Sequence, residues 1–272
     1  MPDAGPTMSP TPEPALVPSL PRRDRIAILI GLFGVTLVAW VYLIVMALAM
    51  EEMPMDGADI MGIHPWSVLE FFLMFLMWAV MMVGMMVPTA VPMTLIYAAV
   101  ARKAASQDRP LASTATFVLG YIVMWTLFSA AATFIQWGLD QAALLSPMMV
   151  SSSPFLGAGL LIAAGAYQWM PFKDACLQHC RAPAHFFAQH WHTGRVGAFR
   201  MGLEHGAFCL GCCWALMGLL FLGGVMNLLW IAAITLFVLL EKVLPFGDRG
   251  GRVMGVLMIL VGILTLAGIG MS

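Results

Sequence analysis

The chain has 272 residues, of which 61% are hydrophobic and only 10% are charged, and its mean hydropathy is +0.90. A soluble domain carries about a quarter charged residues, so this composition excludes a soluble globular protein and predicts an integral membrane protein in a lipid bilayer. The formal net charge of −1 identifies no partner, and we expect no nucleic acid among the partners.

Apolar stretches of the length of a membrane helix recur along the chain. A helix that spans a bilayer needs about 20 predominantly apolar residues. The expected helices cover residues 26–50, 67–100, 111–137, 154–170, 201–222, 225–241 and 252–270. The Pro-, Ser- and Thr-rich residues 1–25 cannot form a core, and we expect a disordered tail there. The sequence thus predicts an all-α, polytopic bundle of about seven transmembrane helices, with residues 26–272 as a single domain.

Two prolines interrupt the second expected helix. Pro88 and Pro92 each remove one backbone hydrogen bond and free the carbonyl four residues earlier, which belongs to Gly84 or to Pro88 itself. We therefore expect a kink at this point. A freed carbonyl inside a membrane bundle must find another partner or line a cavity.

The distribution of basic residues predicts the orientation of these helices. With a cytoplasmic N-terminus, the cytoplasmic segments are the tail and residues 101–110, 171–200 and 242–252. All 13 Lys and Arg residues of the chain fall in these four segments. Cytoplasmic segments carry an excess of Lys and Arg, so we predict a cytoplasmic N-terminus and a C-terminus on the outer side.

Cysteine and histidine are concentrated in one stretch, from residue 176 to residue 213. It holds all five cysteines and five of the six histidines: Cys176, Cys180, Cys209, Cys212, Cys213, His179, His185, His190, His192 and His205. Sulfur and imidazole gathered in this way are typical of a transition-metal site. The sequence therefore predicts bound metal, with a cytoplasmic loop over 171–200 as part of the site.

The spacing of these residues suggests how they could meet. His205, Cys209, Cys212 and Cys213 are at positions i, i+4, i+7 and i+8, which lie on one face of a helix. Cys176 and Cys180 are also four residues apart. If the helices on either side of the loop are neighbours, the site consists of Cys176, Cys180, Cys209 and one of Cys212 and Cys213, with His205 or His179 as alternatives.

Sulfur ligands suit both Cu(I) and Zn(II), and we favour copper over zinc. We do not expect haem, because CLQHC is not the CxxCH attachment motif and His205 is the only histidine within reach of the membrane interior. The alternative is that the cysteines are small apolar residues of the core.

Two further features of this region have competing interpretations. Glu204 is an ionisable side chain at membrane depth and so a functional candidate, but it could instead pair with Arg200 one turn earlier. The histidines at 185, 190 and 192 alternate with Phe186, Phe187 and Trp191, a pattern that favours an interfacial amphipathic segment over a set of ligands.

A second group of soft donors is expected on the outer side. Met53, Met55, Asp56 and His64 could collect copper there, with Glu70 at the mouth of the pathway, although a solvated acidic loop explains the same residues. One face of the second helix then carries Met74, Met77, Met81 and Met85. This stripe could relay copper through the bilayer, or it could be ordinary packing.

The strings CLQHCRAP and GAFRMGLEHGAFCLGCCWALMG, with WAVMMVGMMVPTAVPM before them, resemble a bacterial family of predicted metal-binding integral membrane proteins, a domain of unknown function. The resemblance covers roughly residues 65–270. It strengthens the six candidates Cys176, Cys180, His205, Cys209, Cys212 and Cys213, and it implies a bacterial inner membrane.

Three functions remain open from the sequence. The first is copper transport or metallochaperone-like delivery, for which no ATP-binding P-loop is present or needed. The second is a metal- or haem-containing subunit of a membrane oxidoreductase; the sequence leans against an enzyme. The third is an assembly partner of another membrane subunit or of a second copy, where Gly157, Gly159 and Gly165 would suit close helix packing.

Overall fold

The computed structural model describes residues 20–51, 66–105, 114–146, 150–151 and 153–268. Apart from one isolated antiparallel bridge between Leu145 and Ser151, the regular structure in these ranges is helical. The elements in chain order are α1 (Arg22–Glu51), α2 (Val68–Met86), the 3₁₀ turn η1 (Pro88–Ala90), α3 (Val91–Ala105), α4 (Thr114–Gln141), α5 (Pro154–Tyr167), α6 (Pro171–Arg181), α7 (Pro183–Gln189), α8 (Gly194–Gly218), α9 (Leu220–Gly223), α10 (Leu228–Val243) and α11 (Gly247–Leu266). The all-α prediction is confirmed.

Within the described ranges, five helices are long and apolar enough to cross a membrane: Arg22–Ala49, Val68–Lys103, Thr114–Gln141, Gly194–Gly223 and Gly247–Leu266. A sixth span results if α5 and α6, which meet at a bend of 65°, are counted as one. The remaining expected helix is α10, whose 16 residues reach only about 24 Å at 1.5 Å per residue. Of the seven membrane helices that the sequence predicts, five to six are therefore confirmed as candidate spans.

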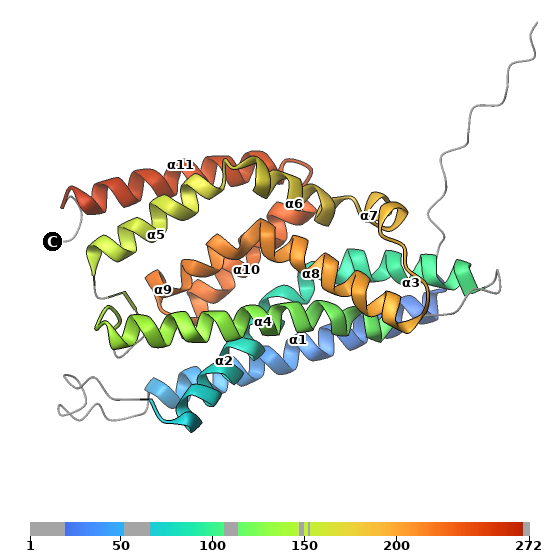
Figure 1. Ribbon diagram of the computed structural model, residues 1–272, viewed down its shortest axis with the longest axis horizontal. Helices are drawn as coiled ribbons and strands as arrows, with labels where there is room; N and C mark the ends of the chain where they lie inside the picture. The colour runs from blue at the N-terminus through green and yellow to red at the C-terminus, as the bar shows by residue number, and fades with distance from the viewer. Residues whose placement is uncertain (1–19, 52–65, 106–113, 147–149, 152, 269–272) are drawn as a thin grey trace, which may run out of the picture.

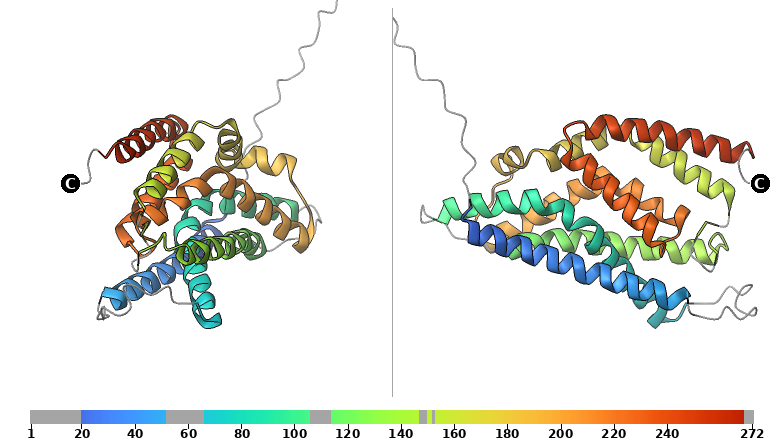
Figure 2. Two further views of the ribbon diagram at one scale, coloured as in Figure 1. Left: turned by 60° about the vertical axis from the view of Figure 1, so that its left-hand side comes forward. Right: turned by 180° about the vertical axis from the view of Figure 1, so that it is seen from behind.

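Helices that are distant in sequence lie side by side in the bundle. In Figure 1, α11 runs along α5 at one edge, α8 lies against α4 in the middle, and α1 and α2 form the opposite edge. Figure 2 shows the same grouping from two further directions. The start of α1, the end of α3, and α7 lie at one end of the bundle, where Arg102 of α3 forms an ion pair with Asp24 of α1.

The prediction of a loop over residues 171–200 is wrong. This segment forms α6 and α7, and α8 begins at Gly194, seven residues before the expected start at residue 201. Pro171 and Pro183 each stand in the first turn of a helix, where the missing N–H would have no intrahelical partner anyway. Their position after short turns marks helix starts, whereas the polar composition of the segment suggested a loop. At the other end of the chain, α1 begins at Arg22, inside the expected tail.

The kink at Pro88 and Pro92 is confirmed. The chain leaves α2 after Met86, passes through η1, and continues as α3. The carbonyl of Gly84 accepts a hydrogen bond from Nε1 of Trp40 at 3.2 Å, and the carbonyl of Pro88 accepts one from the Val91 N–H. Both freed carbonyls thus have the new partners that the bilayer interior requires.

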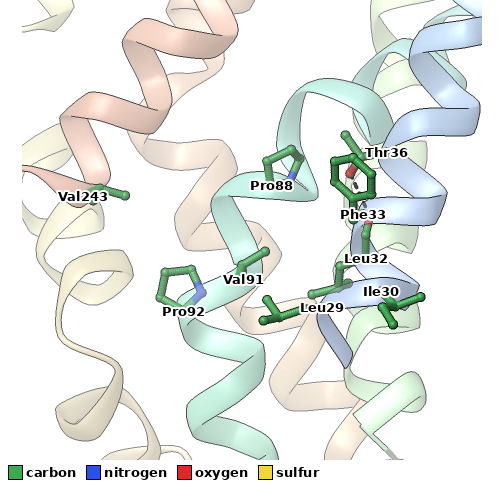
Figure 3. A pocket seen from close by; sticks show the side chains of 9 residues that line it. All are labelled: Leu29, Ile30, Leu32, Phe33, Thr36, Pro88, Val91, Pro92 and Val243. Carbon is green, nitrogen blue, oxygen red and sulfur yellow. Dashed lines mark hydrogen bonds between the residues drawn. The ribbon is translucent and has the colours of Figure 1, made fainter. Parts of the chain in front are cut away.

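An apolar groove of about 610 Å³ lies beside the kink. Figure 3 shows Leu29, Leu32 and Phe33 of α1 on one side, Pro88 and Pro92 in the middle, and Val243 of α10 opposite. Because nearly all of its lining atoms are carbon, we expect this groove to accommodate lipid acyl chains.

Glycines allow two helix pairs to approach very closely. A Cβ on Gly202 of α8 would overlap the backbone carbonyl of Phe117 on α4, and a Cβ on Gly120 would overlap the carbonyl of Phe199. In the second pair, a Cβ on Gly165 of α5 would collide with the backbone of α11 at Gly255. The small-residue spacing seen in α5 therefore serves packing within this chain at Gly165, rather than contact with a foreign helix.

Candidate metal centre

Three cysteines of α8 point into the middle of the bundle. Cys209, Cys212 and Cys213 are 0–1% exposed and belong to the main hydrophobic core. The thiols of Cys212 and Cys213 both donate to the backbone carbonyl of Cys209 at 3.0 Å, which brings the three side chains together on one face of the helix. The predicted shared face of α8 is confirmed.

Cys180 of α6 adds a fourth thiol to this face. Cys180 is partly buried and packs against the core cluster that contains Cys209, Cys212 and Cys213. These four cysteines, called here the thiol group, come from two helices that pack on each other. All five cysteines of the chain are free, so no disulfide competes for the sulfur atoms.

Cys176 lies beside the thiol group rather than in its centre. It is 6% exposed and packs on Gly211, where an added Cβ would be 2.7 Å from its Sγ. Gly211 is two residues from Cys209, which is about 200° around a helix. The structure thus places Cys176 against α8 at Gly211, one residue before Cys212, while Cys180 packs against the core that contains Cys209.

Cys209 is the hub of a polar cluster that the sequence did not reveal. Its Sγ accepts a hydrogen bond from Nζ of Lys242 at 2.8 Å and lies 3.0 Å from the hydroxyl of Tyr121. The same ammonium donates to Oγ1 of Thr89 at 3.1 Å, and the Tyr121 hydroxyl donates to the carbonyl of Met86 at 3.0 Å. One sulfur atom therefore joins α8 to α10, to α4 and to the kink after α2.

Lys242 was available in the sequence only as a basic residue that follows an apolar helix. The signal that could have identified it is the pair Glu241–Lys242, because two adjacent ionisable residues at the end of a membrane helix need partners inside the bundle. Nothing in the sequence pointed to Tyr121.

His205 is buried one turn before Cys209 on α8. Only 3% of it is exposed, and its ring stacks near those of Tyr121 and Phe117, with centroids 5.4 and 6.1 Å away. Its Nδ1 atom is buried and has no hydrogen-bond partner among the described residues. An imidazole nitrogen left unpaired next to a thiol group can serve as a ligand.

The other candidates of this region make their contacts with residues outside the thiol group. The ring of His179 stacks on that of Phe208, with centroids 4.2 Å apart. Glu204 accepts a hydrogen bond from Nε of Arg200 at 2.8 Å, which is the pairing that the sequence offered as the alternative to a functional role.

The methionines of α2 lead toward the thiol group. Met77, Met81 and Met85, with Met82 and Met86, are fully buried and belong to the same core as the cysteines. Met74 is half-buried, and its sulfur accepts a hydrogen bond from Nε2 of Gln136 at 3.6 Å. Tyr121 connects the end of α2 to the thiol group, because its hydroxyl donates to the carbonyl of Met86 and lies 3.0 Å from the sulfur of Cys209. This arrangement suits a relay and packing equally.

The outer candidates are placed only in part. Met53, Met55, Asp56 and His64 lie outside the described residues. Glu70 closes a capping box at the start of α2, where its carboxylate accepts from the Ser67 N–H at 2.6 Å.

Among the residues that the structure describes, no three His, Cys, Asp or Glu side chains are arranged as they stand to hold a metal ion. Cu(I) is a soft ion that two sulfur ligands can hold, whereas zinc requires four ligands in a tetrahedron. Fewer side chains of the thiol group must therefore converge to bind copper than to bind zinc. The position beside Cys209 is taken by the ammonium of Lys242.

Comparison with protein families gives a match. The family model PpoB2, described as a copper chaperone, matches residues 75–265, which run from the middle of α2 into α11. Neither the curated proteins nor the solved structures give a match.

Proposed function

Since the chain belongs to the PpoB2 family of copper chaperones, we propose that its thiol group binds Cu(I) within the membrane for delivery to another site. The observation that carries the proposal is that Cys180 of α6 packs against the core that holds the buried thiols of Cys209 and Cys212, and that none of them is in a disulfide. Thiolates select Cu(I) over harder ions. His205, with its unpaired Nδ1, is the nearest nitrogen ligand.

Lys242 completes this site by balancing charge. Cu(I) bound by two thiolates carries a net charge of −1, and a buried charge is costly unless it is paired. The ammonium of Lys242 lies 2.8 Å from the Cys209 sulfur and supplies the opposite charge. In the copper-free protein the same contact stabilises the sulfur that will receive the ion.

The route to the site is part of the proposal. Copper enters from the outer side at Met53, Met55, Asp56 and His64, passes along the methionines of α2, and reaches the thiol group near the cytoplasmic end. This direction rests on the predicted orientation, with the N-terminus inside and the C-terminus outside a bacterial inner membrane. The buried line of Met77, Met81 and Met85 supports it.

Copper stoichiometry tests the site directly. We expect protein purified in detergent under reducing conditions to hold about one Cu(I) per chain, and the Cys209→Ser/Cys212→Ser variant to lose it. Cys176→Ser is the matched control and should keep its copper, because Cys176 packs on Gly211 beside the thiol group. Equal copper in the wild type and the double variant would refute the assignment. No copper in any of the three would favour the assembly-partner function instead.

Replacing Lys242 by leucine should weaken copper binding by about 10- to 100-fold, because a hydrogen bond to a charged group contributes about 1.5–3 kcal/mol. Lys242→Arg keeps the positive charge, so its copper affinity should lie between those of the wild type and Lys242→Leu. The measurement is competition for Cu(I) with a chromophoric chelator. Unchanged affinity in Lys242→Leu would show that the charge of the site is balanced by other means.

A further inference from the structure

Three histidines outside the thiol group gather where α6 meets α7. The ring of His179 lies 6.4 Å from that of His185 and 6.2 Å from that of His190, measured between centroids. His185 is exposed and the other two are half-buried, so solvent reaches them. These residues, called here the histidine group, have no part in the function proposed above.

The sequence pattern suggested that this segment lies on a lipid surface, but its apolar side packs into the protein. Phe186 and Phe187 are 0% and 4% exposed and belong to a second core with Tyr97 and Phe117. The aromatic residues of α7 thus have their partners on α3 and α4. Of the histidines, His179 lies on α6, and His190 follows α7 and stacks on Phe186 with ring centroids 4.8 Å apart.

Hydrogen bonds fix which nitrogen each ring presents. Nδ1 of His179 lies 2.8 Å from the carbonyl of Ala175, and Nδ1 of His190 lies 3.1 Å from the carbonyl of Phe186. A carbonyl only accepts, so Nδ1 carries the hydrogen and Nε2 of the neutral ring keeps its lone pair. Nε2 of His185 faces the Gln189 amide nitrogen, which can only donate, at 3.2 Å. A backbone carbonyl on the far nitrogen is the usual support of a metal-binding histidine.

The histidine group adjoins the thiol group through consecutive residues. His179 precedes Cys180 on α6, and Phe208 precedes Cys209 on α8. The rings of His179 and Phe208 are stacked, with centroids 4.2 Å apart and planes 2° from parallel. The Phe208 ring is also 5.9 Å from that of His190. One aromatic ring therefore separates solvent-accessible imidazoles from buried thiols.

We propose that His179, His185 and His190 form a second copper site, at which Cu(I) enters or leaves the thiol group. This inference rests on the proposed function and assigns the exchange step to three residues. Copper stays Cu(I) throughout. A Cu–N bond breaks as a Cu–S bond forms, and the proton displaced from a thiol passes to the released imidazole. Imidazole is a weaker partner for Cu(I) than thiolate, which suits a transient site.

A small closure is needed to form this site. Imidazoles bound to one ion at about 2.0 Å would have centroids roughly 5–5.5 Å apart, so the ring of His179 must approach each of the other two by about 1 Å. The rings of His185 and His190 must also turn toward each other by side-chain rotation, because both belong to the same segment. Ala182 is the single residue between α6 and α7, with φ −117° and ψ 69°. A change at this one junction moves α7, with two of the histidines, relative to His179 on α6.

The first test uses the full chain without its thiol group. Cys180→Ser/Cys209→Ser/Cys212→Ser/Cys213→Ser should retain a weaker Cu(I), and X-ray absorption should show nitrogen rather than sulfur ligands. Adding His179→Ala/His185→Ala/His190→Ala should lower its affinity at least about tenfold. His192→Ala is the control on the same segment, because His192 lies near Glu204 instead, 4.0 Å from its carboxylate. Equal affinity with and without the three histidines would overturn the proposal.

The second test uses the chain with all cysteines present. The three-histidine variant should keep the stoichiometry of the thiol group but exchange Cu(I) with an external chelator at least about tenfold more slowly. An unchanged exchange rate would overturn the inference while leaving the thiol site intact. Failure of the proposed function itself would look different, because the wild type would then hold no copper that depends on Cys209 and Cys212.

Discussion

Replacing Lys173 by methionine is expected to lower the free energy of unfolding by about 3–5 kcal/mol, since removing one member of a buried ion pair leaves the other charge unpaired. Lys173 of α6 forms an ion pair with Glu241 of α10, and each side chain is 2% exposed. Gln168 is buried next to them, and its amide has no hydrogen-bond partner among the described residues. This amide is neutral, so it cannot replace the charge of the lost ammonium.

The measurement is unfolding of the purified protein in mixed detergent micelles. The double variant Lys173→Met/Glu241→Leu should recover most of the loss, because it removes both charges at once. Arg102→Met is the surface control: its partner Asp24 is 40% exposed, and such pairs contribute about 0–1 kcal/mol. A loss below about 1 kcal/mol in Lys173→Met would contradict the prediction.

This ion pair also connects stability to the metal centre. Lys173 lies on the same helix as Cys180, and Glu241 directly precedes Lys242. The pair therefore joins the helix that supplies the fourth thiol to the helix that supplies the ammonium. We expect the Lys173→Met variant to bind copper more weakly even where it folds, because both groups reach Cys209 from the helices that the pair holds together.

The sequence predicted what depends on composition and local spacing. Apolar length located the membrane helices, the two prolines located the kink, and the spacing of Cys209, Cys212 and Cys213 placed them on one face. Each of these features depends on residues close together in the chain. The freed carbonyl of Gly84 was also foreseen, but its partner Trp40 was not, because that contact spans 44 residues.

What the sequence did not predict arises from tertiary contacts. Which of Cys176 and Cys180 approaches the thiols of α8 depends on how α6 crosses α8. Their four-residue spacing in the sequence does not distinguish them. Lys242 contacts Cys209 only because α10 ends beside α8, and the two residues are 33 positions apart. The helices at 171–189 were not predicted because their exposed faces are polar and each buries only a few apolar residues.

Gly202→Ala is expected to destabilise the protein by about 3 kcal/mol or more, because the added methyl group overpacks the contact between the backbones of α4 and α8. The added Cβ would overlap the carbonyl oxygen of Phe117. A flexible side chain could rotate away from such a contact, but a helix backbone can respond only if α4 and α8 move apart as whole elements. That separation would also pull Cys209 away from Tyr121, whose hydroxyl lies 3.0 Å from its sulfur.

The matched control is Gly138→Ala in α4, where an added Cβ meets nothing within 4 Å. A glycine-to-alanine change at such a helical position should stabilise the chain by about 0.4–1 kcal/mol, because it restricts the unfolded state. Thermal unfolding in detergent compares the two variants, and Cu(I) competition measures the consequence for the site. If Gly202→Ala unfolds at the same temperature as Gly138→Ala, the close contact of α4 and α8 is not what positions the thiol group. A large difference, with copper affinity reduced only in Gly202→Ala, would tie the position of Cys209 to this single glycine.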